Sequence, residues 1–207
     1  MSDPHLIRTP ADLRAVIGEP KPTIAAKLFD HVDAHASDFI AHSPLLLLAT
    51  ADADGRLDVS PKGDAPGFVE VTGGGRTLLL PDRPGNKLIY GFENILRNPR
   101  VGMIFVVPGV TETLRVNGTA EITRDPGLLE RMSARGMKAL LVTRITVEEC
   151  FFHCGKAFLR SSLWDASSWP EGYRAPLARQ ISARLAGNDS LEQAIDEGLA
   201  ESYRERL

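Results

Sequence analysis

The chain has 207 residues, with 24 basic and 27 acidic side chains and 43% hydrophobic residues, a length that favours one main domain able to bury a core without disulfides. A formal net charge of −3 gives no overall electrostatic reason to bind nucleic acid or an anionic membrane. No apolar run approaches the roughly 20 residues that span a bilayer, and the N-terminus does not resemble a signal peptide. We therefore expect a soluble, cytoplasmic protein whose partners are neither nucleic acid nor membranes.

The first 42 residues are predicted to form a helical extension. Thr9 followed by Pro10 is typical of a helix start, because the hydroxyl can cap free amides and proline loses no hydrogen bond at the first helical position. A second helix is expected to begin near Pro22, and a third, short one over residues 37–41.

Short apolar segments separated by turn residues follow, which predicts β-strands. The predicted strands cover residues 45–50, 56–60, 68–71, 76–80, 101–107, 112–116, 121–123 and 140–147. Pro61 should prevent a regular continuation of the second strand. Helices are expected between strands at residues 86–97 and 126–135. Because most strands are joined by hairpins, we expect a mainly antiparallel small barrel with helices (α+β) rather than a doubly wound parallel sheet.

The C-terminal part is predicted to be helical again. An apolar repeat predicts a helix over residues 175–185, and Ser190 with Gln193 is spaced as a capping box that opens the last helix.

Cys150, His153 and Cys154 lie within five residues of one another. This cluster can be a half-buried strand end, the wall of a binding pocket, or part of a zinc site. Structural zinc sites usually take four ligands from two separate clusters, and the sequence has no second cysteine pair. We therefore predict no metal site.

Residues 78–88, Leu-Leu-Leu-Pro-Asp-Arg-Pro-Gly-Asn-Lys-Leu, are the most informative segment. A strand is expected to run into a turn that places Arg83, Asn86 and Lys87 at a helix start, where free amides favour phosphate. Arg83 can bind a phosphate through two hydrogen bonds, and Lys87 adds a point charge. Lys62 supplies a third cation at the end of an earlier strand. The alternative is that these residues are simply solvated.

Three segments occur in a characteristic order: Arg-Leu-Asp-Val-Ser-Pro-Lys-Gly-Asp at 56–64, Leu-Pro-Asp-Arg-Pro-Gly-Asn-Lys at 80–87, and Asn-Pro-Arg-Val-Gly-Met-Ile-Phe at 98–105. Together they resemble the pyridoxamine 5′-phosphate oxidase-related, FMN-binding split-barrel family. Residues 152–165 are similar to its subgroup with a His-Cys-x-Lys element. The resemblance covers roughly residues 40–167.

The resemblance implies an antiparallel Greek-key split barrel of the FMN-binding type. We expect this barrel over residues 43–167, with helical extensions at 1–42 and 168–207, in a single structural domain. The family also implies a homodimer that binds two FMN molecules in grooves between the subunits.

Several residues match the family's flavin-binding positions. Lys62 matches its flavin-contacting lysine and Lys87 the lysine of its phosphate element, whereas Asn86 stands where the family has arginine and Arg83 would compensate. The expected cofactor-binding residues are Val59, Ser60, Pro61, Lys62, Asp82, Arg83, Asn86, Lys87, His153, Lys156 and Arg160. Lys156 and Arg160, one helical turn apart, would hold an anionic substrate or the phosphate, or form a solvated helix face.

The function implied by the resemblance is an FMN-dependent oxidoreductase acting on a small molecule. Residues 58–61, Asp-Val-Ser-Pro, replace the Arg-x-Val-Leu-Leu run of the vitamin oxidases, so the substrate stays unassigned. His153 of a partner subunit is the candidate proton donor, because its pKa lies near neutrality. The alternatives are a flavin storage or sensor protein without turnover, or a related barrel that binds a deazaflavin or haem.

Overall fold

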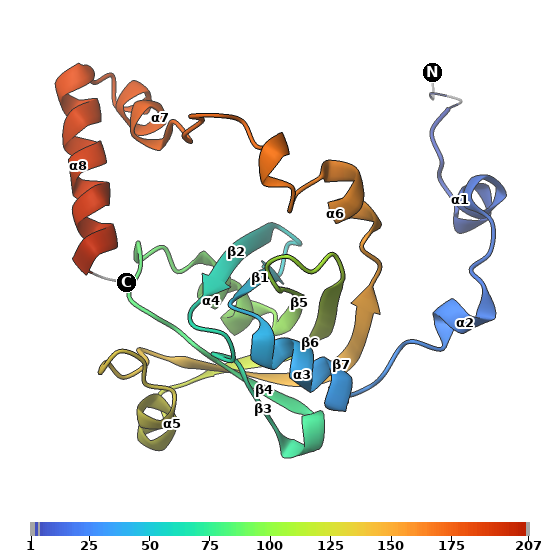
Figure 1. Ribbon diagram of the computed structural model, residues 1–207. Helices are drawn as coiled ribbons and strands as arrows, with labels where there is room; N and C mark the ends of the chain where they lie inside the picture. Colours follow the sequence, from blue (N-terminus) through green and yellow to red (C-terminus); the bar gives the residue numbers. More distant parts are fainter. Residues whose placement is uncertain (1–2, 4, 206–207) are drawn as a thin grey trace.

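The computed structural model describes residue 3 and residues 5–205, and its centre is one curved sheet of seven strands (Figure 1). The strands are β1 (Leu45–Ala51), β2 (Leu57–Gly63), β3 (Glu70–Thr72), β4 (Thr77–Pro81), β5 (Arg100–Val106), β6 (Thr113–Thr123) and β7 (Val142–His153). Their order is β2-β1-β5-β6-β7-β4-β3, and every neighbouring pair is antiparallel. The predicted antiparallel barrel is therefore confirmed, as a curved sheet that does not close between β2 and β3.

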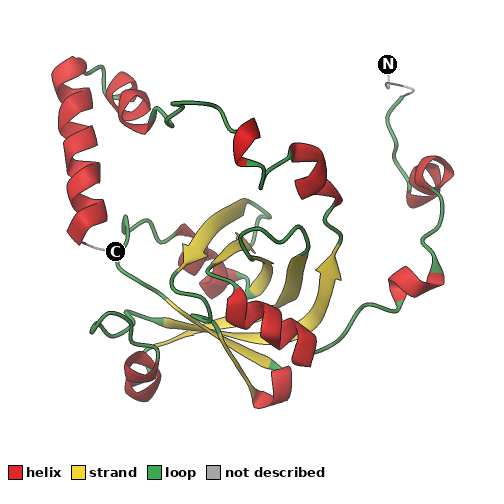
Figure 2. Cartoon of the chain, viewed as in Figure 1, coloured by secondary structure: helices red, strands yellow, loops and turns green. Residues whose placement is uncertain are grey.

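Helices lie before, between and after the strands (Figure 2). They are α1 (Pro10–Ile17), α2 (Pro22–Ala25), α3 (Ala34–His42), α4 (Tyr90–Arg97), α5 (Pro126–Arg131), α6 (Lys156–Ser161), α7 (Leu177–Arg184) and α8 (Asp189–Glu205), with 3-10 turns η1 (Gly73–Gly75) and η2 (Ala166–Ser168). None of the helices within the described residues is both long and apolar enough to cross a membrane.

The core fills the inside of the curved sheet. Strand residues alternate between the two faces, so every second side chain points inward. Examples are Leu46 of β1, Phe105 of β5 and Leu114 of β6, all fully buried. Ile40 of α3 and Ile95 of α4 are also buried in this cluster, so these two helices cover the inner face.

The helices at the two ends of the chain extend away from the barrel (Figure 1). None of the residues of α1 is buried, and its first turn is closed by the predicted cap, with the Thr9 hydroxyl accepting from the Asp12 amide. At the other end α7 packs against α8 and buries Ala178 and Ser182. α2 is only four residues long.

β2 continues through Pro61, contrary to the prediction that the strand stops there. Pro61 is in register with Leu47 of β1. β2 is an edge strand of the sheet, and an edge tolerates a residue without an amide proton because only one side of the strand needs a complete ladder.

Helix boundaries also differ from the predictions, among them those of α8 and α5. α8 begins at Asp189 rather than at Ser190, because the Asn188 side chain accepts a hydrogen bond from the Leu191 amide at 3.1 Å and so takes the capping position. α5 ends at Arg131, and the residues after it form a short bridge between Ala134 and Met137 instead of a further helical turn.

Candidate functional site

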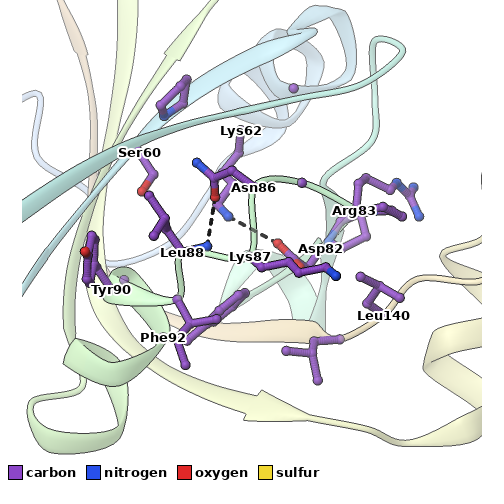
Figure 3. Close-up of a pocket in the computed structure, with 18 of the residues that line it drawn as sticks. Ser60, Lys62, Asp82, Arg83, Asn86, Lys87, Leu88, Tyr90, Phe92 and Leu140 are labelled. Carbon is purple, nitrogen blue, oxygen red and sulfur yellow. Dashed lines mark hydrogen bonds and ion pairs between the residues drawn. The ribbon is translucent and has the colours of Figure 1, made fainter. Parts of the chain in front are cut away.

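A cavity of about 970 Å³ lies between β2, the segment that joins β4 to α4, and the residues just before β7 (Figure 3). Small-molecule sites usually measure about 300–1,000 Å³, so this cavity can hold a ligand of cofactor size. Eight of the predicted site residues line it: Val59, Ser60, Pro61, Lys62, Asp82, Arg83, Asn86 and Lys87. Two segments that are distant in the sequence therefore meet at one site, as the sequence suggested.

β2 supplies one wall of the cavity. Because side chains alternate along a strand, Val59 and Pro61 are exposed whereas Ser60 and Lys62 are half-buried. The Ser60 hydroxyl donates to the Asp58 carboxylate at 2.8 Å. β2 therefore carries an apolar face with Val59 and Pro61, and the hydrogen-bonded pair of Ser60 and Asp58 lies on its opposite face.

Lys62 reaches across the cavity floor to Asp82, which follows β4. Its Nζ lies 3.2 Å from a carboxylate oxygen of Asp82 and 5.1 Å from the centre of the Phe92 ring. Both charged side chains are largely buried, at 24% and 18% exposure. Lys62 is thus held in place by a neutralising partner and an aromatic face.

Arg83 is occupied by protein groups and faces away from the cavity floor. Its Nε lies 2.7 Å from Asp64, its guanidinium donates to the Met132 carbonyl at 2.8 Å, and Figure 3 shows it directed away from Lys62 and Asn86. Burial raises the pKa of Asp64, but hydrogen bonds from the Ala65 amide and from Arg83, with the nearby positive charges, outweigh burial and keep the net pKa below its ordinary value. Arg83 therefore anchors the start of the loop.

The segment before α4 differs from the prediction of a helix starting at Asn86. The Asn86 side chain accepts from the Leu88 amide at 2.9 Å, and Lys87 adopts left-handed backbone conformation with φ of 63°. Such local side-chain bonds compete with helix formation, so α4 begins only at Tyr90. Lys87 is exposed and makes no ion pair within the part of the chain that the structure describes.

Three predicted site residues do not line this cavity. His153 is the last residue of β7, whereas Leu140 and Leu141, just before the start of that 12-residue strand, line the cavity. Lys156 and Arg160 are exposed on α6, which follows β7. The cavity is near the start of β7. Within one chain, His153 lies at the other end of this strand, and Lys156 and Arg160 follow it.

Sequence reasoning missed part of the apolar lining. The residues not singled out include Phe68, Leu88, Ile89, Tyr90, Phe92, Leu140 and Leu141. Tyr90 and Phe92, which follow the Pro84-Gly85 turn by a few residues, were the available signal, but this pattern is equally typical of the packing face of a helix.

Cys150 is part of the core rather than of a metal site. It is 2% exposed, and its backbone pairs with Phe29 through hydrogen bonds of 3.0 and 2.8 Å. Burial, with a smaller contribution from Asp33, raises the pKa of its thiol to about 12, which disfavours the thiolate that a metal needs. Cys154 is exposed. The strand-end interpretation of this motif therefore fits Cys150.

Comparison with known proteins identifies one matching family. The family model described as pyridoxamine 5′-phosphate oxidase matches residues 32–154, which include β1 to β7 and all the cavity-lining residues. No curated protein matches the chain.

Several solved structures are similar to this chain. HupZ from Group A Streptococcus is 22% identical over 58% of this chain and 93% of its own, with a TM-score of 0.48. A protein from Lactobacillus delbrueckii, provisionally described as a pyridoxamine 5′-phosphate oxidase, is 25% identical over 59% and 95%, with a TM-score of 0.46. A conserved hypothetical protein from Mycobacterium tuberculosis is 18% identical over 70% and 94%, with a TM-score of 0.44.

Proposed function

Because the chain belongs to the pyridoxamine 5′-phosphate oxidase family, we propose that it is a cytoplasmic, FMN-dependent oxidoreductase acting on a small molecule. The observation that carries this proposal is the cavity between β2 and α4, where the two segments that resemble the family's flavin-binding motifs face each other.

The residues that line the cavity suit the chemistry of FMN, which combines a flat conjugated ring with a phosphate. Val59, Pro61, Phe92 and Leu140 provide apolar surface for the ring, and Lys87 provides a positive charge that has no ion-pair partner among the described residues. When bound, FMN supplies the redox chemistry, whereas the protein supplies position and electrostatics.

We assign the phosphate contact to Lys87, with Lys62 nearby or toward the ring. Lys87 is exposed on the loop before α4, and Asn86 beside it keeps its amide nitrogen for a ligand while its oxygen holds the loop. Arg83 is assigned an anchoring role instead, because its hydrogen bonds to Asp64 and Met132 would have to break before it could reach a ligand. We assign the Ser60 hydroxyl, which donates to the Asp58 carboxylate at 2.8 Å, to the edge of the ring.

A homodimer is part of the proposal. β2 is an unprotected edge strand, and Leu47 and Val59 leave 37% and 60% of their surfaces exposed on the outer face of β1 and β2. A second copy on this face would cover it. Its residues 153–160 would then form the missing wall of the cavity, with His153 as proton donor and Lys156 or Arg160 near the substrate or phosphate.

The absorbance spectrum of the purified protein, followed by chromatography of the ligand released on denaturation, tests the proposal. FMN bands and released FMN are expected, whereas a Soret band or a released deazaflavin would contradict it. Anaerobic addition of NADH or NADPH should then bleach the flavin at a catalytic rate. Tight FMN binding without bleaching by any donor would favour a storage or sensor protein.

A further inference from the structure

Two cationic side chains and one histidine gather at the far end of β7, away from the cavity. Lys27 comes from the segment after α2, Arg115 from β6 and His153 from the end of β7. The backbone bridge between Phe29 and Cys150 fixes the first of these segments against the strand. Three segments distant in sequence thus converge on one place.

The Phe151 side chain holds both cations in position. Lys27 Nζ lies 4.8 Å from the centre of its ring, and the guanidinium carbon of Arg115 lies 5.4 Å from it. Lys27 Nζ also donates to the Phe152 carbonyl at 3.1 Å. An aromatic face orients a cation but does not neutralise it.

Neither cation is neutralised by an acidic group. Within the part of the chain that the structure describes, Lys27 and Arg115 make no ion pair, whereas Arg144, further back on β7, pairs with Glu121 at 2.7 Å. Glu149, also on β7, accepts a hydrogen bond from Asn117 at 2.9 Å instead. The cluster therefore carries an uncompensated positive charge.

His153 adds an unsatisfied polar atom to this charge. Its Nδ1 is buried and has no hydrogen-bond partner among the described residues. Burial lowers the pKa of His153, and the charges of Arg115 and Lys27 lower it further, so all three effects favour the neutral imidazole. A buried polar atom without a partner is unfavourable, and a ligand oxygen could supply the missing hydrogen bond.

We propose that Lys27, Arg115 and His153 form an oxyanion-binding site that takes the phosphate or carboxylate group of a small molecule. The oxyanion would lie between the two cations and accept a hydrogen bond from the imidazole. Within one chain none of these three residues lines the cavity, so the site is formed without the cofactor. In the proposed homodimer, His153 would also face the cavity of the second copy.

NMR titration of the His153 imidazole in the full-length chain tests the site, between about pH 5 and pH 8. Inorganic phosphate should raise the midpoint of the His153 titration in a saturable way, because a bound anion stabilises the imidazolium. Acetate in a second series shows whether a carboxylate is also accepted. A response to either anion supports the site, and the absence of a saturable response to both would overturn it.

Substitutions identify the residues that are responsible for the effect of phosphate on the His153 titration. Arg115→Gln should raise the midpoint without added anion, because a nearby cation is lost, and should weaken phosphate binding roughly tenfold or more. Lys27→Gln, on an exposed segment, should have the same two effects. Arg144→Gln removes the same charge from an ion pair outside the cluster and should keep the parental response. Equal phosphate affinity in Arg115→Gln, Lys27→Gln and the parent would also overturn the proposal.

Discussion

At the scale of single residues, the conformation of Lys87 distinguishes it from the other cations around the cavity. A side chain in left-handed backbone conformation costs about 1–2 kcal/mol, and such conformations concentrate at functional sites. Lys62 is paired with Asp82 and Arg83 with Asp64, so each has a neutralising partner inside the protein. Lys87 has none among the described residues, and its charge is available to a ligand.

Lys87→Ala should therefore weaken FMN binding and leave riboflavin binding nearly unchanged. A charged hydrogen bond contributes roughly 1.5–3 kcal/mol, which corresponds to roughly 10- to 150-fold in affinity for FMN. Riboflavin lacks the phosphate, so a lost phosphate contact cannot affect it. Fluorescence quenching titrations with both flavins at fixed salt measure the difference. Lys21→Ala, which removes an exposed lysine outside the cavity, is the matched control, and a parental FMN affinity in Lys87→Ala would refute the assignment.

At the scale of elements, the turn η1 joins β3 to β4 and packs against the segment before α3. Gly75 has φ of 84° and accepts a hydrogen bond from the Val32 amide at 2.8 Å. A Cβ at this position would overlap the Val32 carbonyl oxygen, whereas a Cβ at Gly74, with φ of 66°, meets no atom within 4 Å. Both glycines have positive φ, but only at Gly75 would an added Cβ collide with a neighbouring segment.

Gly75→Ala should be clearly more destabilising than Gly74→Ala. Left-handed strain alone predicts a loss of about 1–2 kcal/mol in the free energy of unfolding for Gly74→Ala. The displaced Val32 backbone adds about 1–3 kcal/mol for Gly75→Ala. Urea denaturation of both variants measures the comparison, and equal losses would mean that the turn and the segment before α3 are not closely packed.

At the scale of the whole molecule, the proposed dimer would bury the exposed face of β1 and β2 between two subunits. The exposed face of β1 and β2 carries Leu47 in register with Pro61 and Ile104, so a single substitution can place a charge in the middle of this apolar surface. Burying an unpaired carboxylate between two subunits is strongly unfavourable.

In sedimentation experiments, the parent should have a mass of about twice the 22.5 kDa of one chain. Leu47→Asp should have the mass of a monomer and should bind FMN more weakly. Val16→Asp introduces the same charge at a 75% exposed apolar position of α1 and should remain dimeric. A monomeric Leu47→Asp variant that binds FMN as tightly as the parent would contradict a cofactor site shared between subunits.

The sequence alone was sufficient to predict most of the strands and helices and eight of the residues that line the cavity. Short apolar segments and the turns at glycine and proline predicted the strands, because both signals are set by neighbouring residues. The order of the three family-like segments indicated that Val59 to Lys62 belong together with Asp82, Arg83, Asn86 and Lys87, and these eight residues line one cavity in the structure.

Only the tertiary structure determines which groups those side chains contact. Pro61 fits within β2 because that strand is at the edge of the sheet, and Arg83 is held by an aspartate 19 residues earlier. His153 lies at the far end of β7 from the cavity, and Lys27 lies beside a phenylalanine 124 residues later in the chain. These pairings depend on which strands become neighbours, and the local periodicity of a sequence does not contain that information.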